Sequence, residues 1–221
     1  MNTEPSAQVV LRPIASPLAL GFVGLAMGTT ILSALQLSWV PAAQQRFVAI
    51  ALLGFVAPLQ SLASVFGFLG RDTVVATGMG ILSGTWAVIG WSFLASSPGS
   101  TSDALGIVLL VSGASMLIPA TSAMVSKLVP AVILATAAAR LAVSGAYELT
   151  GSSAWEIGVG WGGVALGILA LYGALAIQLE DVLGTSVLPV GRIGQGRAAI
   201  RGTPARQTSG LEHEAGVRQQ L

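Results

Sequence analysis

Long apolar runs without a charged residue make up most of the chain. No charged residue lies between Arg12 and Arg46, and four further long uncharged runs follow before Glu180. Each exceeds the roughly 20 apolar residues that a helix needs to cross about 30 Å of hydrocarbon. A sixth apolar segment of similar length contains Arg140. The pattern predicts six transmembrane helices, at residues 17–37, 47–69, 73–95, 105–125, 128–147 and 157–179.

The runs are apolar on every side, which favours helices over the strands of a membrane barrel. Barrel strands alternate apolar and polar residues over about ten positions, whereas a helix satisfies its backbone hydrogen bonds within one segment. Composition agrees, with 53% hydrophobic and 9% charged residues, against about 25% charged in an ordinary soluble domain. The short connections at 71–72 and 126–127 predict antiparallel neighbours. The predicted fold is all-α, a polytopic membrane protein with six transmembrane helices in a compact bundle that could enclose a central pore.

The distribution of basic residues predicts the orientation in the membrane. One side receives Lys127 and several arginines, whereas the other receives only Arg46. The richer side is cytoplasmic by the positive-inside rule, so we expect a multi-pass protein of the plasma (cytoplasmic) membrane with both termini in the cytoplasm. The chain then divides into a cytoplasmic N-terminal segment (1–13), a six-helix transmembrane domain (14–191) and a polar tail (192–221) whose composition predicts disorder.

Residues with catalytic or metal-binding chemistry are scarce. The chain has no cysteine, and its single histidine, His213, lies in the tail between two glutamates, so we expect neither a metal site nor another cofactor. No span offers a Ser–His pair, paired carboxylates or a phosphate-binding glycine-rich loop. Glu156, Glu180 and Asp181 lie at predicted helix ends, where we expect them to be solvated. An enzyme is the weakest interpretation, and any proton coupling would use edge acids or enter with the substrate.

Glycine pairs four residues apart recur within the predicted spans. This spacing places both glycines on one helix face and lets another backbone approach closely. The contact could lie within the bundle or between protomers, and the last span is the best candidate for an oligomer contact. The pairs are Gly24 with Gly28, Gly80 with Gly84, Gly158 with Gly162, and Gly163 with Gly167.

Polar residues inside the spans tend to face the bundle interior or a water-filled path. In the first span Thr29, Ser33 and Gln36 follow helical spacing, with Thr30 beside them, and Thr77 belongs to a second group of hydroxyls in the third span. The two groups predict a partly hydrated path. The alternative is structural, because serine and threonine can also bond back to their own helix.

Arg140 is a charged residue inside a predicted span. It precedes Tyr147 by about two helical turns, which places it roughly 10 Å inside the membrane boundary. Its side chain could extend outward to the interface or pair with Glu148 on the same helix. Alternatively, Arg140 draws a small anion into a pore, because a guanidinium matches the two oxygens of a carboxylate.

Motifs near both ends of the predicted domain resemble a known family. Residues 15–20 read Ala-Ser-Pro-Leu-Ala-Leu, residues 29–32 read Thr-Thr-Ile-Leu, glycines and aromatic residues recur between 160 and 172, and residues 184–191 read Gly-Thr-Ser-Val-Leu-Pro-Val-Gly. The first segment is similar to the Asn-Pro-Ala-Pro-Leu-Gly-Leu signature of the acetate uptake transporters, also called succinate–acetate permeases. The resemblance covers roughly residues 14–191.

The family resemblance implies a ring-shaped oligomer, a hexamer, with a pore in each protomer for acetate and related small carboxylates. The pore would narrow at Leu82, near Leu25 and near Ala137. Ala137 is smaller than the family's usual residue and Leu82 lacks a hydroxyl, departures that bear on the substrate. The expected substrate path is lined by Ser16, Pro17, Leu18, Leu25, Thr29, Thr30, Ser33, Thr77, Leu82, Thr136, Ala137 and Arg140.

These features favour a membrane transporter or channel for acetate and related small monocarboxylates, with proton coupling left open. The expected partners are the carboxylate substrate, the lipid bilayer and further copies of the chain, and no nucleic acid. One alternative is a channel for a small neutral solute such as urea or an amide. Another is a non-transporting membrane subunit or sensor.

Overall fold

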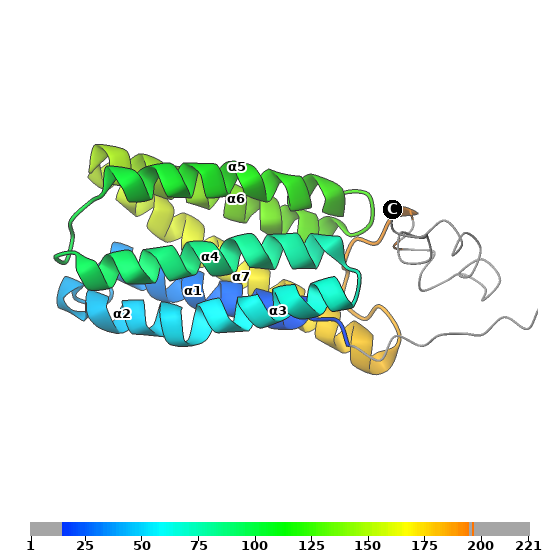
Figure 1. Cartoon of the computed structure of the whole chain (residues 1–221). Helices are drawn as coiled ribbons and strands as arrows, with labels where there is room; N and C mark the ends of the chain where they lie inside the picture. Colours follow the sequence, from blue (N-terminus) through cyan, green and yellow to red (C-terminus); the bar gives the residue numbers. More distant parts are fainter. Residues whose placement is uncertain (1–14, 195, 197–221) are drawn as a thin grey trace, which may run out of the picture.

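Six helical segments, each long and apolar enough to cross a membrane, confirm the six predicted spans (Figure 1). They lie within residues 15–194 and 196, the part of the chain that the computed structural model describes. The predicted N-terminal segment and His213 lie outside these residues. The protein is a multi-pass membrane protein with an all-α fold. Its helices are α1 (Leu18–Gln36), α2 (Gln45–Ala51), α3 (Ala57–Leu69), α4 (Thr73–Ala95), α5 (Asp103–Ala123), α6 (Leu128–Thr150) and α7 (Ser153–Leu183), and a 3₁₀ turn (Ala42–Gln44) precedes α2.

The connections between the helices gather at two ends of the bundle (Figure 1). One end, which we call the loop end, contains the connections 37–41, 96–102 and 151–152. The other end, which we call the terminal end, contains the start of α1, the end of α7 and the turns 70–72 and 124–127. Because every connection joins two segments at a single end, successive spans run antiparallel, as the short connections predict.

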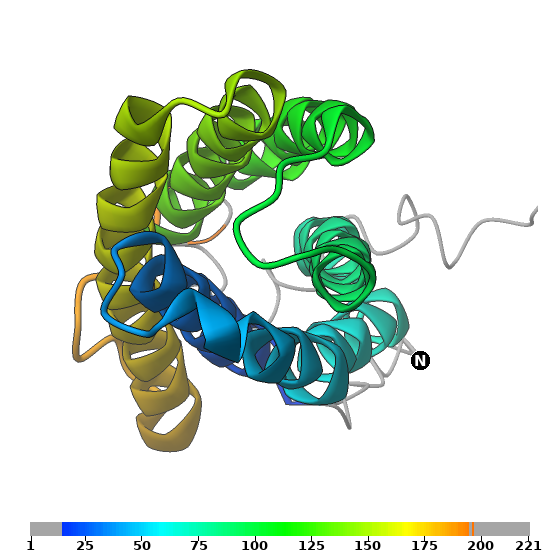
Figure 2. The same cartoon turned by 90° about the vertical axis from the view of Figure 1, so that its left-hand side faces the viewer.

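The spans pack around a closed sequence of neighbours. α1 contacts α3, α3 contacts α4, α4 contacts α5, α5 contacts α6, α6 contacts α7, and α7 returns to α1. Figure 2, which looks along the bundle from the loop end, shows this ring-like order. The first and last helices, α1 and α7, are far apart in sequence but make extensive contact with each other.

The second span changes its helical form near its middle. A π-helical turn, Leu52–Val56, joins α2 to α3, and Pro58 follows in the first turn of α3. Proline has no N–H and its ring crowds the preceding turn, and a π turn is one way in which a helix accommodates such a break. Gly28 of α1 faces this turn, since a Cβ at that position would lie 2.8 Å from Val56 Cγ1. The bulged span can therefore pack closely against α1.

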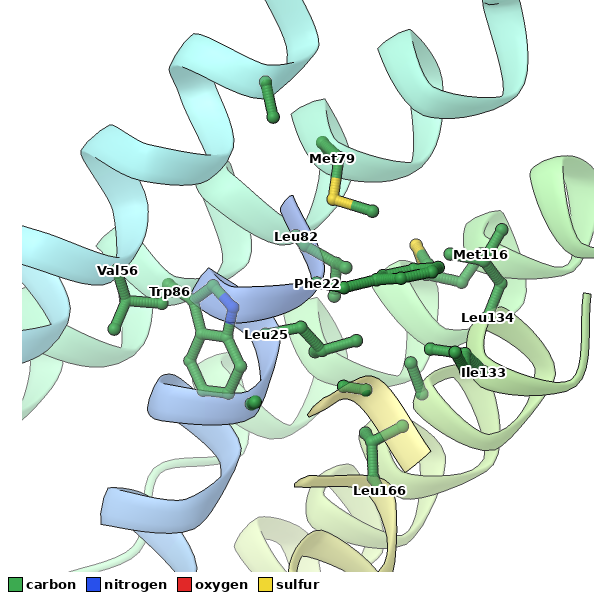
Figure 3. Packing of buried hydrophobic residues seen from close by; sticks show 14 of the residues in the cluster. Phe22, Leu25, Val56, Met79, Leu82, Trp86, Met116, Ile133, Leu134 and Leu166 are labelled. Carbon is green, nitrogen blue, oxygen red and sulfur yellow. The ribbon is translucent and has the colours of Figure 1, made fainter. Parts of the chain in front are cut away.

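Large apolar side chains fill the middle of the bundle. Phe22, Leu25, Met79 and Leu82 are each at most 1% exposed, and Figure 3 shows them close together, with Leu134 beyond Phe22. In a membrane the competing neighbour of such side chains is lipid, so close packing rather than exclusion of water holds them together. At this level the centre of the bundle is occupied by side chains.

The predicted glycine pairs serve two different surfaces. A Cβ at Gly28 or Gly163 would collide with side chains of this chain, so these glycines bring helices of one bundle together. Gly158 and Gly162 differ, because a Cβ at either would meet no described atom of a neighbouring element within 4 Å. The two glycine pairs of α7 therefore face in different directions, one toward α1 and one away from the bundle.

The segment that follows α7 folds back across the terminal end of the bundle. Arg192 donates hydrogen bonds to both carboxylate oxygens of Glu180, through Nε at 2.9 Å and through Nη2. Ile193 N donates to Ser126 O at 3.0 Å, and Tyr172 Oη donates to Pro189 O at 2.9 Å. Glu180 is only 6% exposed, so the expectation of a solvated Glu180 is wrong: an arginine from the following segment covers it. Ordered contacts of the bundle extend past residue 191.

Candidate functional site

A cavity of about 130 Å³ opens at the loop end of the bundle. Its walls come from α1, α2, α4, α5, α6, α7 and the loop-end connections, with apolar side chains such as Leu32, Ile89 and Leu109 and a set of polar residues. The polar set comprises Gln36, Ser38, Gln45, Ser100, Ser144, Tyr147, Glu148 and Glu156. Such a mixture of apolar walls and a few polar groups is typical of a small-molecule site.

Two polar side chains fix the 96–102 connection beside this cavity. Gln45 Nε2 donates to Phe93 O at 3.1 Å, and Gly99 N donates to Gln45 Oε1 at 3.2 Å. Glu148 Oε2 accepts a hydrogen bond from Ser102 N at 2.8 Å. Glu148 therefore orders the loop rather than pairing with Arg140, and the ion pair considered from the sequence is not formed.

Arg140 lies inside the bundle and does not extend outward to the interface. Its side chain is only 5% exposed, and its Nη2 donates to Gln36 Oε1 at 3.2 Å. Within residues 15–194 and 196 no carboxylate lies within ion-pair distance of the guanidinium. Arg140 thus holds a buried charge whose observed side-chain partner is a neutral amide.

Ser33 and Gly163 complete the surroundings of this guanidinium. Ser33 is 0% exposed, and a Cβ on Gly163 would overlap Ser33 Oγ and lie 2.6 Å from Arg140 Nε. Thr29 Oγ1 donates to Gly163 O at 3.1 Å, which ties α1 to α7 at this level. The structure therefore brings the predicted stripe of α1, Thr29, Ser33 and Gln36, together with Arg140. We call Ser33, Gln36, Arg140 and Gly163 the arginine cluster.

Hydrogen bonding in the arginine cluster is incomplete. Ser33 Oγ and Arg140 Nε are buried, and neither has a hydrogen-bond partner among the described residues. A buried donor without a partner costs about 1–3 kcal/mol, and more when it is charged. An anion with two acceptor oxygens would satisfy such donors and offset the charge, and a carboxylate matches a guanidinium in this way. The cluster is therefore chemically suited to a small carboxylate.

The predicted narrow point lies deeper in the bundle than the arginine cluster. Leu25, Leu82 and Ala137 are each 1% exposed, and Figure 3 shows Leu25 and Leu82 on neighbouring helices, with Phe22 beside them. Phe22 is fully buried and is absent from the predicted path. It lies about one helical turn before Leu25, so the helical spacing of α1 could have indicated it.

The remaining predicted path residues lie apart from the arginine cluster. Ser16 N donates to Asp181 Oδ2 at 3.3 Å at the terminal end, near Pro17 and the buried Leu18. Thr136 Oγ1 donates to Val132 O of its own helix at 2.8 Å, and Thr77 is half-buried. Their place in a path stays a prediction.

Thr30 lies on another side of α1 from the arginine cluster. It is exposed and lines an apolar groove on the bundle surface with Met27, Ile31 and Leu171. A Cβ on Gly167 would lie 2.6 Å from Thr30 Oγ1, so this hydroxyl packs against α7. The neighbouring threonines of the sequence motif therefore face different surroundings.

The fold is similar to that of a solved bacterial acetate channel, SatP. The two structures superpose with a TM-score of 0.72 over 80% of this chain and 99% of the channel, at 20% sequence identity. No protein-family model matches the chain, and no curated protein sequence matches it. The similarity shows that the two proteins share a fold.

Proposed function

We propose that the protein is a membrane transporter or channel for acetate and related small monocarboxylates, and a divergent member of the acetate uptake transporter family. The observation that carries this proposal is the buried guanidinium of Arg140, which has no acidic partner among the described residues and lies against a cavity-lining amide. The shared fold with a bacterial acetate channel supports it.

The arrangement suggests how a carboxylate would cross. The solute leaves bulk water in the loop-end cavity, where polar side chains replace part of its hydration. The Arg140 charge offsets the cost of moving an anion into the bundle, a cost that would otherwise be several kcal/mol. Beyond the arginine cluster, the solute must pass the apolar narrow point at Leu25 and Leu82. These side chains must move apart for each passage, which favours solutes with few carbon atoms.

Uptake into proteoliposomes tests the proposal. We expect saturable uptake of labelled acetate above that of empty vesicles, with competition from formate and propionate. Uptake of urea or acetamide that is insensitive to membrane potential and to carboxylates would favour the neutral-solute alternative, since Gln45 and Ser144 could also bind an amide. Absence of any solute flux from correctly folded protein would favour a non-transporting subunit.

The narrow point should set the size limit of the substrate. We expect Leu82→Ala to raise butyrate uptake relative to acetate uptake, because a shorter side chain leaves more room beside Leu25. The matched control is Leu117→Ala, since Leu117 is 52% exposed on α5. The truncation of a buried leucine costs about 2–5 kcal/mol of stability in soluble proteins, so uptake is normalised to folded protein. An unchanged butyrate-to-acetate ratio in well-folded Leu82→Ala would contradict this size limit.

The loop end is proposed to face outward and the terminal end the cytoplasm, in the plasma membrane. The basic residues Arg71 and Lys127 at the terminal end support this orientation by the positive-inside rule. Self-association is proposed as well. It is supported by the outward pair Gly158 and Gly162, which offers a smooth surface to another helix.

A further inference from the structure

Gln36 lies between the loop-end cavity and the Arg140 guanidinium. Its side chain is part of the cavity wall, whereas Arg140 is not. Its Oε1 accepts the hydrogen bond from Arg140 Nη2 at 3.2 Å. A solute that enters the cavity therefore meets Gln36 before it can reach the charge.

A glutamine amide is a poor match for the donors behind it. The amide is neutral, and its oxygen accepts from Nη2, while Arg140 Nε and Ser33 Oγ have no partner in the part of the chain that the structure describes. A carboxylate carries a full negative charge and two acceptor oxygens, and its hydrogen bonds with a guanidinium are stronger than those of an amide. The same site can therefore hold Gln36 in the absence of substrate and bind a carboxylate more strongly.

We propose that Gln36 is an exchangeable internal ligand of Arg140, which a substrate carboxylate displaces in order to bind. The incoming anion takes over the hydrogen bond from the guanidinium and gains the hydroxyl of Ser33, and the Gln36 side chain moves away. This inference rests on the proposed function and specifies how its site distinguishes a carboxylate from a neutral solute. An ionised carboxylate displaces the amide, whereas urea or acetamide, which carries only a neutral carbonyl oxygen, gains nothing by the exchange.

Two substitutions of Gln36 should change acetate transport in opposite directions. Gln36→Ala removes the competitor, so we expect the KM for acetate to fall several-fold. Gln36→Glu places a carboxylate of nearly the same shape beside Arg140, so at neutral pH the KM for acetate should rise by at least about ten-fold or uptake should be lost. Gln44→Ala is the control, because Gln44 is exposed in the 3₁₀ turn of the same end and should leave the KM unchanged.

The binding step is measured separately from transport, so that the two proposals can fail independently. A ligand that binds only the folded protein raises its melting temperature. Added acetate should raise the melting temperature of the detergent-solubilised wild type, more strongly in Gln36→Ala and not in Gln36→Glu. If Gln36→Ala does not fold, Gln36→Leu takes its place. If the wild type transports acetate and both variants keep its KM, the proposed exchange of Gln36 for acetate is overturned. If the acetate-induced rise in melting temperature is largest in Gln36→Ala and absent in Gln36→Glu, but the wild type shows no flux, the proposed transport is overturned and the exchange stands.

Discussion

Replacement of Arg140 by leucine should lower acetate uptake by at least about ten-fold, which corresponds to about 1.4 kcal/mol of lost interaction with the anion. The guanidinium is the only charge in the arginine cluster as the structure describes it, so its loss leaves an anion to enter a neutral, apolar bundle. The free energy of unfolding should rise or stay unchanged, because a buried charge without an opposite charge is costly and leucine places no charge inside the bundle.

Both quantities are measured on the same purified protein. Initial rates of labelled acetate uptake are compared with the melting temperature in detergent for wild type and Arg140→Leu. Arg46→Leu is the matched control, because Arg46 is exposed at the loop end and should leave both quantities nearly unchanged. A folded Arg140→Leu protein with wild-type uptake would reject the role of Arg140, while loss of folding would show that the arginine serves the bundle itself.

Gly163→Ala should reduce both stability and acetate uptake. The added methyl group would overlap Ser33 Oγ and lie 2.6 Å from Arg140 Nε, so α1 and α7 must separate or both polar groups must move. Overpacking of this kind costs about 1–3 kcal/mol, and displacement of the donors from the site should lower uptake by about ten-fold.

The adjacent glycine provides the control for this substitution. Gly162 belongs to the same helix, but a Cβ there meets no described atom of a neighbouring element within 4 Å. Gly162→Ala should therefore leave the stability of the single protomer unchanged or raise it by about 0.5–1 kcal/mol, with normal uptake per protomer. Because Gly162 also lies on the surface proposed for self-association, the oligomeric state of both variants is measured alongside. If thermal melting and uptake change equally in the two variants, the effect comes from the loss of a glycine in α7 and not from the arginine cluster.

The sequence predicts the spans well because the membrane imposes a simple physical requirement. A segment that crosses hydrocarbon must be apolar over about 20 residues. Five uncharged runs and one apolar run that contains Arg140 therefore identify all six spans and their order. The spacing of Thr29, Ser33 and Gln36 also identifies the face of α1 that meets Arg140, since residues three or four apart share a helix face. These signals are local and can be read from one segment at a time.

Contacts between distant segments could not be predicted in this way. The sequence offers Glu148 as a nearby partner for Arg140, and the structure pairs Arg140 instead with Gln36, which lies 104 positions earlier. Glu180 looked solvated because nothing in α7 indicates that Arg192 folds back over it. The selection of such partners depends on how α1, α6 and α7 pack together, and hydropathy alone does not specify that packing.

The most direct measurement uses a single cysteine in a chain that contains none. In Ser33→Cys, a small water-soluble thiol reagent reaches position 33 only if a hydrated path leads from the cavity to the arginine cluster. We expect the thiol to react, and acetate to slow the reaction in a concentration-dependent manner while urea does not. An unreactive thiol in folded protein, or a reaction rate that acetate leaves unchanged, would contradict a carboxylate passage beside Arg140.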